Sequence, residues 1–317
     1  MMRSLITGGA GFIGHHLATT LIDRGDPVRI LDSFATGFRS RLEPLLPSIE
    51  LIEGDIRRAK DLDKAMEGCD VVFHLAAIPS VLRSMRDPGM TNDVNVNGTV
   101  EVILAAARGG VRRVVFAGSS AVYGNSLELP RREAHLPDPL SPYAVSKLAG
   151  EHYLHVIGSS RGVETVVLRY FNVFGGSQDP ESEYAAVVPR FVTAGLRGER
   201  PLVYGDGTQS RDFTHVDNVA AANLLASTAP GVSGLTFNIG CGGRYTLLEL
   251  LHVIGEAIGT PLEPTFLPAR EGDVPHSQAD ISRAADGLGY RVIVPFKEGV
   301  HRTVAWYRDR QSPGSST

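Results

Sequence analysis

The chain has 317 residues, of which 43% are hydrophobic and 21% are charged, a composition typical of a globular protein large enough for two domains. Its formal net charge of −4 argues against a surface for nucleic acid or an anionic membrane. Its two cysteines, Cys69 and Cys241, are isolated, which excludes a disulfide framework and zinc-ligand spacing. No apolar run approaches the length of a membrane span, and glycines interrupt the apolar start where a signal peptide needs continuity. We therefore expect a cytoplasmic protein without a nucleic-acid or membrane partner.

The part of the chain before Tyr170 alternates between two patterns. Short runs rich in Val, Ile, Leu or Phe are predicted to form strands at 3–7, 27–31, 49–54, 70–76, 112–118 and 163–170. Amphipathic stretches between them, such as 12–25 and 96–110, are typical of helices. This alternation predicts an α/β fold, a Rossmann-type doubly wound parallel sheet with helices on both faces.

The rhythm weakens after Asn172, where Gly, Pro and charged loops become more frequent. The segment 236–240, TFNIG, predicts one further strand that returns to the sheet. We therefore expect a larger domain formed by 1–172 and about 208–240. A smaller, discontinuous C-terminal α/β domain is expected to contain about 173–207 and 241–310, followed by a flexible tail at 311–317.

A glycine-rich stretch, TGGAGFIG, follows the first predicted strand and opens the first predicted helix. Its Gly8, Gly11 and Gly14 have the spacing of a dinucleotide-binding turn. Glycines let the backbone approach a pyrophosphate, whose charge is met by the helix N-terminus. A tight turn without a ligand is the alternative, but the acidic residue that ends the second strand favours a dinucleotide.

That acidic residue, Asp32, follows Gly14 at the distance where a carboxylate accepts hydrogen bonds from the adenosine ribose. The carboxylate would repel a 2′-phosphate, so NAD is favoured over NADP. Arg39 and Arg41 lie close enough in sequence to leave NADP open. Asp55, after the third strand, is interpreted either as an adenine contact or as a turn residue without a role.

Tyr143 and Lys147, in SPYAVSKLAGE, are four positions apart in a predicted helix, so they share one face. A phenol gains from a nearby ammonium when it must ionise below its usual pKa of about 10. The alternative is that Tyr143 packs and Lys147 is solvated.

Ordered motifs from Ser4 to about Trp306 resemble the extended short-chain dehydrogenase/reductase family, and within it the NAD-dependent nucleotide-sugar epimerases and dehydratases. Similarity is greatest to UDP-glucose 4-epimerase-like enzymes. The motifs are TGGAGFIG, GDI, HLAA, NVNGT, SSAVYG, SPYAVSK, LRYFNVFG, YGDGTQSRDFTHV, FNIG and REGDVPHSQAD.

The resemblance implies three catalytic residues. Tyr143 matches the family's acid/base, and Lys147 would bind the nicotinamide ribose and stabilise the phenolate together with the cofactor's positive ring. Lowering a tyrosine pKa from about 10 to about 7 needs roughly 4 kcal/mol, which two cations in a water-poor cleft can supply. Ser119 would hydrogen-bond the sugar oxygen that gains or loses a proton.

The resemblance also implies the contacts of each ligand. The residues expected to bind NAD are Gly8, Gly11, Phe12, Ile13, Gly14, Asp32, Asp55, Ile56, Leu75, Ala76, Ala77, Asn95, Tyr143 and Lys147. Those expected to bind a UDP-sugar are Ser84, Ser119, Tyr143, Asn172, Arg211, Arg270 and Asp273. Asn172, Arg211 and Arg270 would hold the diphosphate, and Asp273 a ribose hydroxyl. No metal is expected, because His152 and His155 have no third ligand near them in sequence.

Several reactions share the first step, in which Tyr143 takes a hydroxyl proton while hydride leaves C4 of the sugar. A 4,6-dehydratase or a uronate decarboxylase needs further acid/base groups just after Ser119, and Ser120 and Ala121 cannot supply them. We therefore expect C4 epimerisation of a UDP-hexose through a 4-keto intermediate. A non-catalytic sensor of NAD or nucleotide sugar could lose Ser119, Tyr143 or Lys147, and all three are present. A ketone reductase is disfavoured by Asp32, which opposes NADPH.

The sugar pocket is predicted from one position, Ser277, where hexose-specific relatives carry a bulky aromatic residue. The small side chain leaves room for a 2-acetamido group, so the N-acetylhexosamine form is expected to be tolerated. A hexuronate stays an alternative, with Arg83 and Ser84 as candidate donors.

A homodimer is expected, built from helices near 97–109 and 143–158. These helices carry more apolar residues than one sheet face needs, namely Val102, Ile103, Leu148, Leu154 and Val156.

Overall fold

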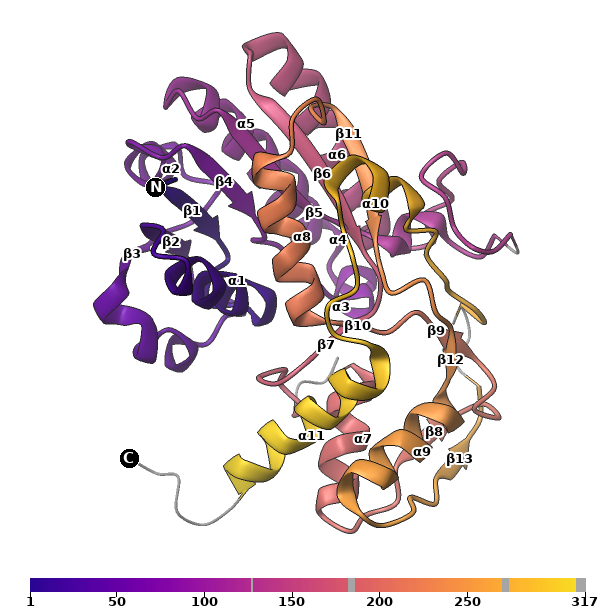
Figure 1. Ribbon diagram of the computed structural model, residues 1–317. Helices are drawn as coiled ribbons and strands as arrows, with labels where there is room; N and C mark the ends of the chain where they lie inside the picture. Colours follow the sequence, from indigo (N-terminus) through magenta and orange to yellow (C-terminus); the bar gives the residue numbers. More distant parts are fainter. Residues whose placement is uncertain (127, 182–185, 270–273, 312–317) are drawn as a thin grey trace.

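The computed structural model describes residues 1–126, 128–181, 186–269 and 274–311. Its centre is a seven-stranded sheet in which every pairing is parallel (Figure 1). From one edge to the other the strands are β11 (Leu235–Ile239), β6 (Glu164–Tyr170), β5 (Arg113–Ser119), β4 (Val71–His74), β1 (Ser4–Thr7), β2 (Val28–Asp32) and β3 (Ile49–Glu53). The predicted parallel sheet, including the returning strand, is confirmed. Strand order reverses between β1 and β4, and open sheets of this kind bind ligands beyond the carboxyl ends at such a point.

Alternate residues of each central strand point to opposite faces of the sheet, and two separate cores result. Ile6 and Phe73 belong to the core under α1 (Phe12–Asp23), α8 (Val216–Thr228) and α10 (Ser282–Leu288). Leu5 and Val72 belong to the core under α2 (Ala59–Met66), α5 (Gly98–Arg108) and α6 (Pro142–Arg161). Helices on both faces confirm the predicted doubly wound architecture.

A third core lies beside the sheet, in the C-terminal part of the chain. It joins α7 (Val187–Leu196), α9 (Leu247–Ile258) and α11 (Phe296–Gln311). Three short strand pairs accompany these helices: β8 (Leu202–Tyr204) with β13 (Thr265–Leu267), β9 (Ser210–Arg211) with β12 (Tyr245–Thr246), and β7 (Val173–Phe174) with β10 (Thr214–His215). One element departs from the expected division. The sequence predicts α10 in the smaller domain, but its Ala284 and Leu288 pack in the sheet's core.

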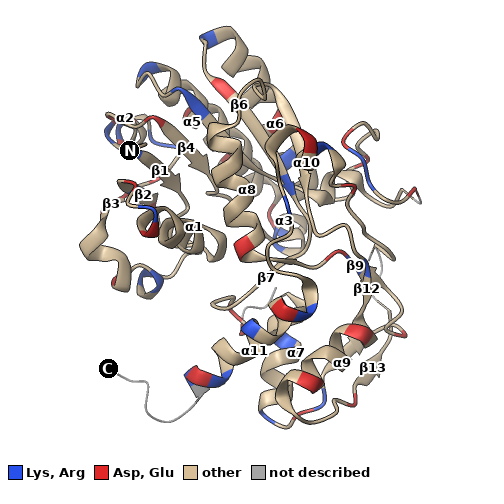
Figure 2. Cartoon of the chain, in the orientation of Figure 1, with Lys and Arg blue, Asp and Glu red and all other residues tan. Residues whose placement is uncertain are grey.

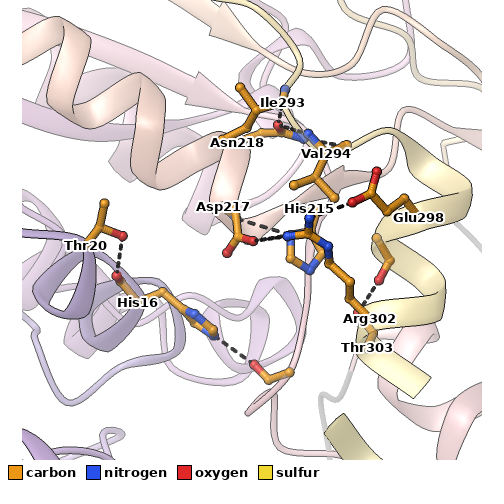
Figure 3. Close-up of polar contacts among 12 residues, drawn as sticks. His16, Thr20, His215, Asp217, Asn218, Ile293, Val294, Glu298, Arg302 and Thr303 are labelled. Atoms are coloured by element: carbon orange, nitrogen blue, oxygen red, sulfur yellow. Dashed lines mark hydrogen bonds and ion pairs between the residues drawn. The ribbon is translucent and has the colours of Figure 1, made fainter. Parts of the chain in front are cut away.

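Side chains of α8 and α11 tie this third core to the sheet (Figure 3). Asp217 on α8 accepts a hydrogen bond from Arg302 on α11 at 3.1 Å. The Asn218 side chain is fully buried and bonds the backbone of Ile293 and Val294 at 2.8 to 2.9 Å. These contacts fix α11 beside the Rossmann unit.

Acidic and basic residues are mixed along α11 (Figure 2). Within the described ranges, no helix is long and apolar enough to cross a membrane. The same ranges contain no group of three His, Cys, Asp or Glu side chains placed to hold a metal ion.

Candidate active site

A cavity of about 1100 Å³ lies along the carboxyl ends of the parallel strands. The residues that follow β1, β2, β3, β4, β5 and β6 all contribute to its wall. The predicted ligand-binding residues that line it are Gly8, Gly11, Phe12, Ile13, Gly14, Asp32, Asp55, Ile56, Leu75, Ala76, Ala77, Ser119, Tyr143, Lys147, Asn172 and Arg211. The fold therefore brings most of the predicted site to one cavity.

The glycine turn between β1 and α1 is too tight for larger residues. Gly8 has φ +75°, and an added Cβ would lie 2.7 Å from Cα of Ala76. A Cβ on Gly14 would lie 2.3 Å from the Gly8 carbonyl oxygen. Gly11 is the N-cap of α1 and offers no side chain to the first helical N–H groups. N–H groups left uncapped in this way suit the pyrophosphate of a dinucleotide.

Asp32 ends β2 at the wall of the cavity and is 7% exposed. It accepts hydrogen bonds from the N–H groups of Ala10 and Phe34, both at 2.8 Å. Burial raises the pKa of the carboxyl group, while these two bonds act in the opposite direction. Asp32 is thus held by backbone hydrogen bonds at the wall of the cavity.

Arg39 and Arg41, the two arginines that left NADP as a possible cofactor, already have partners within the chain. Arg41 donates to Ser177 Oγ at 3.1 Å, to the Ser177 carbonyl at 2.6 Å and to the Ala10 carbonyl at 3.2 Å. Arg39 is ion-paired with Glu53. Since both guanidinium groups already have partners, the arrangement favours NAD.

Asp55 follows β3 and forms an ion pair with Arg57 at 2.6 Å. Hydrogen bonds from Arg57 hold the pKa of the Asp55 carboxyl group below its usual range. Asp55 lines the same cavity as Asp32, so an adenine contact is compatible with its position.

Tyr143 and Lys147 lie in the first two turns of α6. Pro142 and the Ser141 cap, which accepts from the Ala144 N–H at 3.2 Å, start this helix at the cavity. Nζ of Lys147 donates to the Ala117 carbonyl at 2.9 Å. Burial lowers the pKa of Lys147 to about 8, and the Glu151 carboxylate opposes this shift.

The Tyr143 phenol lies beside Ser119, the last residue of β5. Burial raises the pKa of Tyr143, and the hydrogen bond with Ser119 opposes this rise without cancelling it. Lys147 lies one helical turn after Tyr143 on the same helix.

Two predicted contacts lie outside the cavity wall. Ser84 on α3 (Val81–Arg86) is fully buried, and its Oγ accepts from the Tyr143 N–H at 3.0 Å. Asn95 is 2% exposed and bonds the Ile78 N–H at 2.8 Å and Ser146 Oγ at 3.0 Å. Both side chains bond parts of the chain that border the site, namely α6 and the loop after β4, and they do not line the cavity.

The expected diphosphate contacts are only in part within the described ranges. Nδ2 of Asn172 donates to the Asp212 carbonyl at 3.4 Å, and Asn172 lines the cavity. Arg211 donates to the carbonyls of Ser210 and Pro275 at 3.0 and 3.1 Å on the wall of the same cavity. Arg270 and Asp273 lie outside the described residues.

Comparison with known proteins agrees with this geometry. Residues 4–240 match the model of the NAD dependent epimerase/dehydratase family. The chain belongs to this family.

Similar proteins cover nearly the whole chain. A putative UDP-glucose 4-epimerase of Methanocaldococcus jannaschii is 38% identical over 96% of this chain and 98% of its own. The structure of UDP-glucose 4-epimerase from Thermotoga maritima with UDP-glucose has a TM-score of 0.93 and 34% identity, covering 98% of this chain and 100% of the other. The structure of a UDP-N-acetylglucosamine 4-epimerase from Methanobrevibacter ruminantium M1, in complex with UDP-N-acetylmuramic acid, has a TM-score of 0.93 and 37% identity. It covers 98% of this chain and 99% of the other.

Membership of the epimerase/dehydratase family confirms NAD as the cofactor and the chain as an NAD-dependent enzyme. The glycine turn, the uncapped N-terminus of α1 and Asp32 fit this dinucleotide. Oxidised NAD held by these residues would add a positive charge to the cavity that Tyr143 lines.

Sequence reasoning missed two features of this family member. Glu151 and Arg169 form a buried ion pair of 2.7 Å close to Lys147, and Glu151 could have been found from its position one helical turn after Lys147. Arg131 lines the cavity although it is 2% exposed. Its surroundings in sequence, LPRREA, are those of a surface loop, so no local pattern indicates its burial.

Proposed function

We propose that the chain catalyses C4 epimerisation of a UDP-hexose through a 4-keto intermediate. One observation carries this proposal. Ser119 of β5 and Tyr143 and Lys147 of α6 line the same cavity as the glycine turn. A cytoplasmic location, expected from the sequence, is part of the same proposal.

Each side chain has a separate task. Ser119 hydrogen-bonds the C4 oxygen, and Tyr143 removes its proton and later returns one. The ammonium of Lys147 stabilises the phenolate, and Glu151 keeps that ammonium charged. When bound, NAD would supply the acceptor for the hydride from C4 and the source of hydride for the other face of the 4-keto sugar.

A 4,6-dehydratase or uronate decarboxylase would need an additional acid/base group beside Tyr143. Ser120 and Ala121 line the cavity there and cannot act in this way. Among the described residues, the carboxylates on the cavity wall are Asp32, Asp55 and Asp179. Asp32 and Asp55 follow β2 and β3, and Asp179 interacts with Arg41. The acidic residues of the cavity wall therefore favour epimerisation over dehydration or decarboxylation.

Ser277 supports a wide sugar pocket. It lines the cavity together with Val274, and its N–H donates to the Ser210 carbonyl at 3.0 Å. A hydroxymethyl side chain at this point excludes little volume, and discrimination by steric exclusion is lost when the excluding atoms are absent.

The proposal is tested with UDP-glucose, UDP-N-acetylglucosamine, UDP-glucuronate and their 4-epimers. We expect interconversion of at least one epimer pair without added cofactor, because a self-regenerating epimerase retains NAD. The purified protein is expected to release NAD on denaturation. We also expect kcat/KM for the acetamido sugar to lie within about a thousandfold of that for UDP-glucose, equivalent to roughly 4 kcal/mol of discrimination.

Retained NAD without turnover of any sugar would indicate a non-catalytic binding protein. A stronger preference for UDP-glucose than a thousandfold would mean that another residue closes the pocket left by Ser277.

We further propose a homodimer in which Val156 is kept from the expected contacts and the other expected residues are replaced. Val102, Ile103 and Leu154 are fully buried within the chain and pack under the sheet, so they are not free for a partner. Leu148 is partly buried as well. Exposed apolar residues on α6 and α3 remain, namely Val145, Tyr153, Val156, Leu82 and Met85. Such a patch is typical of a subunit interface.

Sedimentation at micromolar concentration should give a dimer. Val156, which is 69% exposed, provides the test: Val156→Glu should shift the protein toward monomer, because a charge on this face opposes burial in an interface. A wild-type protein that sediments only as a monomer would contradict the proposal.

A further inference from the structure

Arg131 is a buried cation on the wall of the active-site cavity. Its backbone N–H donates to the Gln278 carbonyl at 2.7 Å, and its carbonyl accepts from the Asp280 N–H at 2.8 Å. This pairing fixes the backbone of Arg131 beside the segment 275–280. The residue lines the cavity and is 2% exposed.

The guanidinium of Arg131 lacks the partner that a buried charge requires. Its Nη2 donates to the Gly124 carbonyl at 3.5 Å, a weak bond, and its Nη1 has no partner among the described residues. Tyr123 and the Glu128 carboxylate act on its charge, but Glu128 is paired with His135 at 3.1 Å. By contrast, Arg169 is similarly buried, and Glu151 pairs with it at 2.7 Å. A buried guanidinium without a counter-charge destabilises the folded state, so a ligand that supplies one is expected.

The position of Arg131 indicates which part of the substrate it faces. The segment 275–280 lies between Ser210 on one side and Arg131 on the other, through the Ser277–Ser210 and Arg131–Gln278 backbone bonds. Arg211, the proposed diphosphate ligand, follows Ser210.

Arg131 is linked to the stretch of chain that follows Ser119. Its weak bond is to Gly124, which directly follows the turn η4 (Ser120–Tyr123) that begins after Ser119. Since Ser119 is proposed to bond the C4 oxygen, we infer that Arg131 faces the sugar part of the substrate.

We propose that Arg131 pairs with a carboxylate carried by the sugar, so that the preferred substrate is an acidic UDP-sugar. The inference rests on the proposed epimerisation. The weak bond to Gly124 leaves the guanidinium able to turn toward the cavity, where a carboxylate accepts two N–H groups at once. A neutral hydroxymethyl group at C6 would leave the charge uncompensated.

Arg131 thus replaces Arg83 and Ser84 as the donor for a hexuronate. Ser84 already accepts from the Tyr143 N–H and is fully buried. Arg83 lines the cavity but is only half-buried on α3, so water can solvate its charge.

The test compares Arg131→Met with Arg131→Lys and with Arg132→Met, a neighbouring arginine that is exposed and ion-paired with Asp280 at 3.1 Å. Substrates are UDP-glucuronate, with its carboxylate at C6, UDP-N-acetylmuramate, with its carboxylate on the 3-O-lactyl group, and UDP-glucose. We expect Arg131→Met to lower kcat/KM for one of the acidic sugars by at least about a hundredfold and for UDP-glucose by less than about threefold. Arg131→Lys should be intermediate, and Arg132→Met should match the wild type. The acidic sugar that responds identifies the position of the carboxylate.

The melting temperature of the Arg131 variant distinguishes a structural role of this side chain from a role in substrate recognition. Because Nη1 of Arg131 has no hydrogen-bond partner among the described residues and Glu128 is paired with His135, Arg131→Met should melt at or above the wild-type temperature. An equal loss with acidic and neutral sugars, or a lower melting temperature accompanied by such a loss, would overturn the proposal.

If no sugar is turned over, the proposed epimerisation itself fails. The role of Arg131 is then decided by calorimetric measurement of the affinity of the wild type and of Arg131→Met for each sugar nucleotide. A loss of affinity for the acidic sugar nucleotides alone in Arg131→Met would then support the inference. Unchanged affinity would refute it.

Discussion

Replacing Tyr143 with phenylalanine should lower kcat by about 10²–10⁴-fold, the usual contribution of a positioned acid/base, while NAD stays bound. The variant keeps the ring, its backbone bond to Ser84 and the start of α6, and it removes only the phenol oxygen beside Ser119. Turnover is measured with the best sugar of the substrate panel, and bound NAD is measured after denaturation.

Tyr153→Phe is the matched control, because Tyr153 lies on the same helix and is 48% exposed, away from the cavity. It should retain wild-type turnover. Normal kcat in Tyr143→Phe would remove Tyr143 from the proton transfer and with it the central step of the mechanism.

Glu151→Ala should be the most destabilising of the substitutions considered. Glu151 and Arg169 have side chains only 4% and 6% exposed and are 2.7 Å apart, so the change leaves Arg169 buried without a counter-charge. The expected cost is about 3–5 kcal/mol of unfolding free energy. For a chain of this size we expect a melting temperature lower by roughly 10 °C.

Asp63→Ala provides the control, because Asp63 pairs with Arg108 at 2.7 Å with both side chains about half exposed. Asp63→Ala should lower the free energy of unfolding by less than about 1 kcal/mol. The double variant Glu151→Leu with Arg169→Met should recover part of the stability, since neither charge is then buried alone. Equal melting temperatures for Glu151→Ala and the wild type would mean that water solvates Arg169.

The parts of the fold that the sequence predicts are those specified locally. Gly8 and Gly14 are required by contacts within one turn and its neighbouring strand, so their spacing alone indicates the dinucleotide turn. The separation of Tyr143 and Lys147 fixes their common face in any helix. The apolar runs of the central strands are buried on both sides, a pattern that does not depend on other parts of the chain.

The differences concern side chains whose direction is decided by distant packing. Ser84 and Asn95 are expected to contact a ligand, but in the structure they bond α6 and the loop after β4 and are not among the residues that line the cavity. Val102 and Ile103 are predicted at an interface because the sequence does not show how many helices share one sheet face. Arg131 escapes prediction because its burial depends on the segment 275–280, which lies much later in the chain.

The edge strand β11 has a consequence for the order in which the molecule is made. Its partner β6 ends at Tyr170, yet β11 begins only at Leu235, after β7, α7, β8, β9, β10 and α8. During synthesis, β6 therefore stays an open sheet edge while the whole segment 171–234 is added. Unpaired edges of apolar strands recruit other strands, and this one contains Val166, Val167 and Leu168. The interval before β11 arrives is thus the period in which a nascent chain is most exposed to aggregation, and any factor that delays the segment 171–239 lengthens it.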